Sequence, residues 1–185
     1  MTYTIPDFGP SDLLTSEKEG MRRVRVDVAQ TGFFEGREFR TFYEFSIPSG
    51  QSVVGRFSSP IDFILFQQIL QVDAGAIKLT AITGGTPGGT YNNPLPVIGK
   101  NRMSKRPQPY YVPVSTVTTG GTITGGTIVE VVRVVSSGST AQRATVGGQF
   151  ADERGLPAGD YYIKLENISN TTAEGVYQIY WEERP

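Results

Sequence analysis

Hydrophobic and polar residues alternate with a period of two along most of this chain. The alternation is clearest in two runs near its end, residues 161–167 and 176–183. Successive side chains of a strand point to opposite faces, so each run predicts a half-buried β-strand. The apolar members of the two runs, which we expect to face the core, are Tyr161, Ile163, Leu165, Tyr177, Ile179 and Trp181.

The same pattern recurs through the rest of the sequence. Further strands are predicted at residues 21–29, 38–47, 52–58, 61–72, 76–83, 110–119, 127–136 and 141–146. Turn-forming residues such as Gly, Pro and Asn separate them, and no stretch has a convincing helical period. About ten short strands without helices favour an all-β fold, a jelly-roll-like antiparallel sandwich of two sheets.

Two stretches lack the alternation. Residues 1–20 carry Pro6, Gly9 and Pro10 with weak periodicity, which predicts an extended N-terminal arm ahead of a β-sandwich domain at residues 21–185. Residues 84–108 form one long loop that begins with a Gly-rich segment at 84–89. This segment lacks the Gly-Lys-Ser/Thr ending of a phosphate-binding loop, so we assign its glycines to loop geometry.

The second half of the long loop mixes apolar with basic residues. A basic patch beside aromatics could bind nucleic acid or an acidic surface, or it could be solvated. The interleaved apolar residues favour a loop that docks on another subunit, because a solvated loop has little reason to carry them. The residues of this predicted protein interface are Leu95, Val97, Ile98, Lys100, Arg102, Met103, Lys105, Arg106, Tyr110 and Tyr111.

The amino-acid composition limits which partners and which kinds of metal or catalytic site can be expected. The 185 residues include 17 Lys and Arg against 18 Asp and Glu, a net charge of −1, which gives no electrostatic reason to expect a nucleic-acid or membrane partner. Cys and His are both absent. Without them the usual zinc, iron–sulfur and haem ligands are missing, and so are the Ser-His-Asp and Cys-His centres. We expect no cofactor, although carboxylate sites for Ca²⁺ or Mg²⁺ stay open.

Two pairs of adjacent carboxylates suggest a glycosidase, namely Asp152 with Glu153 and Glu182 with Glu183. Neighbours in a strand point to opposite faces, so the second pair cannot act together. The first pair lies in a turn beside Arg154 and fits a solvated corner. We therefore expect no enzymatic activity and no catalytic residues. The first ten residues also lack a basic start followed by an apolar run, so no signal peptide is expected.

Three stretches carry a resemblance to known proteins: residues 95–104 (LPVIGKNRMS), the repeated Gly-Gly-Thr, and the ending from Gly155-Leu156-Pro157 to Pro185. Over residues 48–185 they resemble small virion proteins of tailed bacteriophages. The resemblance implies a β-sandwich that assembles on the virion, often as a trimer, without catalysis. It defines no functional residues.

Two functions follow from this resemblance. One is a capsid decoration (cement) protein that stabilises the shell through contacts between subunits, which the arm and the apolar–basic loop favour. The other is a tail- or fibre-associated adaptor or adhesin, which should expose aromatics, and Tyr91, Tyr110 and Tyr111 are the candidates. Either function predicts a homo-oligomer, with a trimer favoured, that contacts capsid or tail subunits in a virion assembled in the host cytoplasm.

Overall fold

The computed structural model describes residues 14–18, 21–25, 31–102, 111–136, 142–147 and 154–185. The chain divides into two compact units, Met1–Thr31 and Gly32–Pro185. In the first unit, β1 (Leu14–Lys18) and β2 (Met21–Arg25) pair as an antiparallel hairpin. The strand expected at residues 21–29 therefore belongs, in its described part, to this hairpin.

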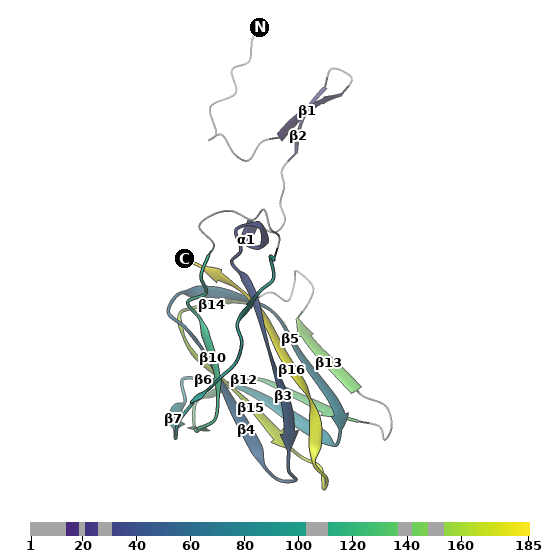
Figure 1. The fold of residues 1–185 in the computed structure, drawn as a ribbon, viewed down its shortest axis with the longest axis vertical. Helices are drawn as coiled ribbons and strands as arrows, with labels where there is room; N and C mark the ends of the chain where they lie inside the picture. Colours follow the sequence, from purple (N-terminus) through teal and green to yellow (C-terminus); the bar gives the residue numbers. More distant parts are fainter. Residues whose placement is uncertain (1–13, 19–20, 26–30, 103–110, 137–141, 148–153) are drawn as a thin grey trace. The chain divides into compact units, whose positions relative to one another are not determined.

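The second unit is a sandwich of two antiparallel sheets, so the predicted all-β fold is confirmed (Figure 1). We name each sheet after an inner strand. In order, the β15 sheet contains β12 (Thr127–Val135), β6 (Ala76–Thr83), β15 (Gly159–Asn167), β4 (Ser52–Ser59), β10 (Thr116–Thr119) and β8 (Asn93–Pro94).

The second sheet, the β16 sheet, is built around the strand that ends the sandwich. In order, it contains β13 (Gln142–Gly147), β5 (Asp62–Ala74), β16 (Ala173–Arg184), β3 (Glu38–Ile47) and β9 (Ile98–Gly99). A short strand, β14 (Arg154–Leu156), also pairs with β5. A one-turn helix, α1 (Thr31–Phe34), precedes β3 along the chain.

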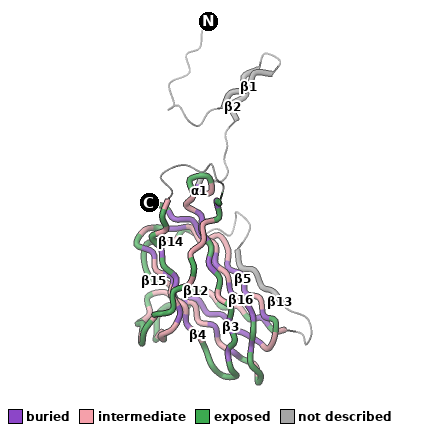
Figure 2. The backbone as a smooth tube through the Cα atoms, in the orientation of Figure 1, coloured by how far each residue is buried: buried purple, intermediate pink, exposed green. Residues whose placement is uncertain are grey.

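The core lies between the two sheets (Figure 2). Trp181 is fully buried at its centre, where its ring meets Phe57 edge-on, with 5.1 Å between ring centroids. The inward positions predicted for β15 and β16 are confirmed. Leu165, Tyr177, Ile179 and Trp181 are buried, and Tyr161 and Ile163 are partly buried against the same cluster.

The outer face of the β15 sheet carries a second, smaller cluster. Tyr162, which alternation places on the polar face, is 2% exposed and packs with Val54 and Ile82. Two short strands inside expected loops, β7 (Thr86–Gly88) and β11 (Thr122–Thr124), pair nearby, and Ile123 and Tyr91 pack on this cluster. Gly121 turns the chain here with a φ of 61°, and a Cβ on it would lie 2.6 Å from the Tyr91 ring. A side chain at this position would therefore be excluded by both conformation and space.

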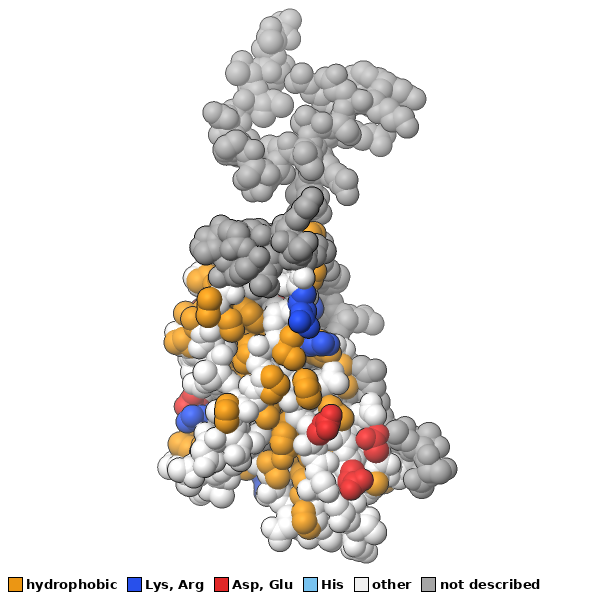
Figure 3. Space-filling view, in the orientation of Figure 1, with side chains coloured by type: hydrophobic (Ala, Val, Ile, Leu, Met, Phe, Trp, Pro, Cys, Tyr) orange, Lys and Arg blue, Asp and Glu red, His pale blue; other side chains and the backbone are white. Residues whose placement is uncertain are grey.

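Large apolar side chains also reach the surface of the sandwich, and Figure 3 shows them beside basic and acidic groups on one face. Most of them fall into two groups. The first lies on α1 and on residues 111–115, and the second lies on β12. The exposed members of both groups are Phe34, Val112, Val114, Ile128, Val129, Val131 and Val135.

Candidate interaction surface

The long loop expected to dock on another subunit lies, in its described part, on its own sandwich. The Leu95 N–H donates to the Val117 carbonyl at 2.8 Å, and β9 pairs with Phe39 and Arg40 of β3. Leu95 and Val97 pack against the main core. Their apolar character is therefore explained by contacts within one chain, without a partner subunit.

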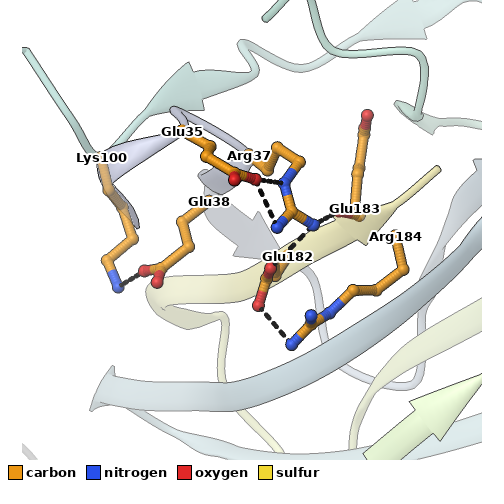
Figure 4. Close-up of polar contacts among 7 residues, drawn as sticks. All are labelled: Glu35, Arg37, Glu38, Lys100, Glu182, Glu183 and Arg184. Carbon is orange, nitrogen blue, oxygen red and sulfur yellow. Dashed lines mark hydrogen bonds and ion pairs between the residues drawn. The ribbon is translucent and has the colours of Figure 1, made fainter. Parts of the chain in front are cut away.

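Lys100 and Asn101 fasten the end of this loop. The Lys100 ammonium pairs with the carboxylate of Glu38, whose side chain is 6% exposed (Figure 4). The same ammonium lies 5.5 Å from the ring centroid of Phe66, close enough for a cation–π contact. Asn101 is buried, and its side-chain amide donates to the Phe33 carbonyl of α1 at 3.0 Å. The loop end and α1 are thus held together.

Glu183 holds the next segment, residues 111–115. Its fully buried carboxylate accepts the N–H of Val114 at 3.1 Å and the N–H of Ser115 at 2.9 Å. Pro113 has no N–H to give to a sheet. This is why the strand expected at residues 110–119 is, among the described residues, confined to Thr116–Thr119: the preceding backbone donors serve Glu183 instead.

Arg37 joins these segments at the same end of the sandwich. Its guanidinium donates to the Glu183 carbonyl at 3.0 Å and pairs with Glu182 at 3.1 Å, while Arg184 also pairs with Glu182 at 3.1 Å (Figure 4). The Arg37 N–H donates to the Gly32 carbonyl at 2.7 Å. The adjacent carboxylates of β16 therefore have separate structural partners.

Tyr111 completes the packing below the surface. Its ring lies against Phe39, with 6.0 Å between centroids. Burial, and next the hydrogen bond to Glu183, raise the pKa of Tyr111 to about 12. The side chain named as a candidate interface and adhesin residue thus contributes mainly to the interior.

The side chains that stay exposed at this end include Phe34 (53%), Val112 (72%), Val114 (45%) and Arg102. We call these four the loop-end surface. Each belongs to a segment fixed by Asn101, Arg37 or Glu183, so the backbone beneath them is well anchored. Arg102 was among the interface residues predicted from the sequence, whereas Val112 and Val114 were not. Their signal was a pair of valines flanking Pro113, a residue that interrupts strand pairing.

The predicted interface residues thus divide into three classes. Leu95, Val97, Ile98, Lys100 and Tyr111 make contacts within the sandwich, and Arg102 is exposed. Residues Met103, Lys105, Arg106 and Tyr110 lie outside the described residues, as do Asp152 and Glu153.

A cavity of about 300 Å³ opens between the sheets. Its walls are mostly apolar, with Phe63, Leu156 and Ile163 among them. One side carries the polar residues Gln68, Glu130 and Arg154: Gln68 donates to Glu130 at 3.1 Å, and Arg154 pairs with Glu130 at 2.9 Å. Gln68 also accepts the hydroxyl of Tyr177, which does not line the cavity.

These polar groups of the cavity bind one another. Burial, and next the charge of Glu130, raise the pKa of Tyr177 well above its ordinary value. In the part of the chain that the structure describes, no three His, Cys, Asp or Glu side chains gather as metal ligands would.

Comparison of the chain with models of protein families, with curated proteins and with solved structures finds no match. None of the helical residues that the structure describes forms a segment long and apolar enough to span a membrane.

Proposed function

We propose that this protein is a non-enzymatic structural component of a bacteriophage virion, a capsid decoration protein that binds shell subunits and stabilises the shell. The observation that carries the proposal is the loop-end surface, where Phe34, Val112 and Val114 expose apolar side chains beside Arg102. The bacteriophage assignment itself comes from the sequence resemblance over residues 48–185.

The anchoring of this surface supports a role in assembly. A protein interface gains most from apolar and Arg side chains held in place before binding, because less conformational entropy is then lost. Asn101 holds α1 and Glu183 holds the backbone of Val114. The backbone of α1, of residues 101–102 and of residues 111–115 is therefore held in place before binding. The matching partner surface is apolar with an acidic group opposite Arg102.

The adhesin alternative has less support among the described residues. Tyr91 donates its hydroxyl to the Thr122 carbonyl at 2.5 Å, and its ring packs against Tyr162. Tyr111 packs against Phe39. Both aromatics are engaged within the chain, whereas an adhesin needs such rings at an exposed tip.

The position of this protein in the virion can be tested with a gold-labelled antibody raised against the purified protein. The antibody is applied to purified virions, which are then viewed by electron microscopy. Label spread over the head supports a decoration protein. Label confined to the tail supports the adaptor or adhesin alternative. Virions that carry no label, and no peptide of this chain by mass spectrometry, overturn the proposal.

The surface itself is tested by Val112→Asp, with Ile168→Asp as the matched control. Both residues are exposed, at 72% and 45%, so neither change removes core packing. We expect Val112→Asp to lower the number of copies retained on virions and Ile168→Asp to leave it unchanged. Equal retention by the two variants would place the contact elsewhere.

A further inference from the structure

β12 is an edge strand with an apolar outer side. It borders the β15 sheet and pairs on one side with β6. Ile128, Val129, Val131 and Val135 are 60%, 53%, 49% and 60% exposed. An open strand edge beside β-branched side chains is a template for pairing with another chain, and proteins that stay monomeric usually protect such edges with charges, Pro or short length.

The opposite edge of this sheet is protected in that way. It is formed by β8, which has two residues, one of them Pro94. β12 has nine residues without Pro, and Arg133 is the one charged residue among its exposed side chains. A bulge between Ile128 and Glu130 interrupts the start of β12, and the regular run Glu130–Val135 that follows is longer than β8. Within the described β15 sheet, the less protected edge is therefore that of β12.

We propose that two copies of this protein associate through antiparallel pairing of their β12 strands, so that the two β15 sheets become continuous. The occupant of the edge is a second copy because the regular run Glu130–Val135 can pair with itself. With the two-fold axis at Val132, each Val131 lies opposite an Arg133 of the other copy. Residues directly opposite in an antiparallel pair share a face, so each exposed Val131 is covered by the aliphatic stem of an Arg133.

Charge helps to select this register. A two-fold axis at Arg133 would set that residue against its own copy, and like charges directly opposite are destabilising. Arg133 already has one like-charged neighbour, because it lies opposite Lys78 of β6 in the same chain. The Lys78 ammonium lies 3.8 Å from the Glu166 carboxylate. An axis at Val132 puts an apolar residue opposite Arg133, whose aliphatic stem can pack on it.

The two-fold contact closes on itself. When a strand edge pairs with the same edge of a second copy, both edges are occupied and the assembly stops at a dimer. An edge that binds a different surface of the next copy instead builds rings or filaments. This inference deepens the proposed assembly role, since it names a surface by which copies join, and it differs from the trimer that the resemblance implies. It is tested in solution without virions, so its failure and the failure of particle attachment are distinguishable.

The first test is sedimentation of the purified protein over a concentration series. We expect a reversible monomer–dimer equilibrium. Val131→Lys puts a second charge on the exposed side of β12 and should weaken dimerisation at least about tenfold. The matched control is Ile168→Lys, an exposed apolar residue between β15 and β16, which should dimerise like the wild type. Unfolding curves check that both variants are folded.

The second test uses the absence of cysteine from the chain. A single Val131→Cys variant, treated with a short bismaleimide, should give covalent dimers, because Val131 is next to the two-fold axis at Val132 and therefore lies near its own copy. Ile168→Cys should not. Three results would each overturn the proposal: a strictly monomeric wild type, a Val131→Lys variant that dimerises like its control, or a Val131→Cys variant that forms trimers without cross-linking.

Discussion

Glu183 and Ser115 form the contact on which the loop end depends. The fully buried Glu183 carboxylate accepts the Ser115 N–H at 2.9 Å and, with its other oxygen, the Val114 N–H.

Glu183→Gln replaces one acceptor by an amide donor that faces an N–H. We expect the free energy of unfolding to fall by about 1–3 kcal/mol, the cost of an unsatisfied buried group. Urea unfolding measures it, and the exposed Glu174→Gln on the same strand is the control. Equal stability of the two variants would contradict the anchoring role.

Tyr111 makes this region sensitive to alkaline pH. Its pKa is raised to about 12 in the folded protein, from an ordinary value of 10.0. The folded state therefore holds the proton more tightly than the unfolded state. The stability from Tyr111 is fully present below pH 10 and is lost as the pH rises from 10 to 12.

The measurement is chemical unfolding across this pH range for the wild type and Tyr111→Phe. Phe cannot ionise, so we expect the stability of the variant to fall less steeply. Other tyrosines, such as Tyr177, also have a raised pKa and will keep part of the slope. Identical slopes for the two proteins would mean that Tyr111 ionises alike in both states.

Lys100 and Arg102 should behave differently although both are basic residues of one loop. Lys100→Ser leaves the buried Glu38 carboxylate without its ion-pair partner and should cost about 1–3 kcal/mol of unfolding free energy. Arg102 is exposed, and Arg102→Ser should stay within about 0.5 kcal/mol of the wild type. On virions, Arg102→Ser should make attachment weaker and less salt-dependent. Thermal unfolding and retention against salt concentration separate the two effects, and replacing both residues together would mix them.

Trp181→Ala tests the centre of the core. The indole is fully buried between Phe39 and Phe57, and its removal leaves a large cavity. We expect a loss of about 3–5 kcal/mol in unfolding free energy. Tyr180→Ala, on the outer side of the same strand, is the comparison and should cost less. If both changes cost the same, the inward and outward faces of β16 are assigned incorrectly.

Deletion of residues 1–20 should leave the sandwich intact. The deletion removes β1, whose partner is β2 in the same compact unit, and the main core is formed by residues from Phe39 onward. We therefore expect the thermal midpoint of the sandwich to stay unchanged. Differential scanning calorimetry provides the measurement, and a substantial drop in the midpoint would show that the first unit supports the second.

Alternation predicted the strands where each face of a sheet has one environment. The bounds of β3 and β6 match the predicted ranges, and most of their apolar residues are buried, although Phe42 is exposed and Ile82 packs in the outer cluster. The pattern could not predict β7, β8 or β9, since pairing of two or three residues leaves no period to detect. It also placed Tyr162 on a polar face, because the strands that cover this residue come from segments distant in sequence.

The predicted interface residues show a second limit on what a sequence pattern can indicate. Apolar residues in a loop indicate burial, but the sequence does not say whether the covering surface belongs to the same chain. For Leu95 and Val97 it does. Glu183 did carry a usable signal: it continues the inward series of Ile179 and Trp181, so a carboxylate on the core side of a strand required buried donors. The donors themselves lie 68 and 69 residues away and could not be identified from spacing.

The place of β16 in its sheet sets the order of folding during synthesis. β16 is hydrogen-bonded to β5 on one side and β3 on the other, yet it is the last strand of the sandwich to be made. Until Ala173–Arg184 has left the ribosome, β3 and β5 have no strand between them and the main core lacks Trp181. The β16 sheet must therefore form after translation of the whole sandwich, through contacts between distant residues, which are slow to form. The nascent chain therefore exposes apolar strands throughout that interval.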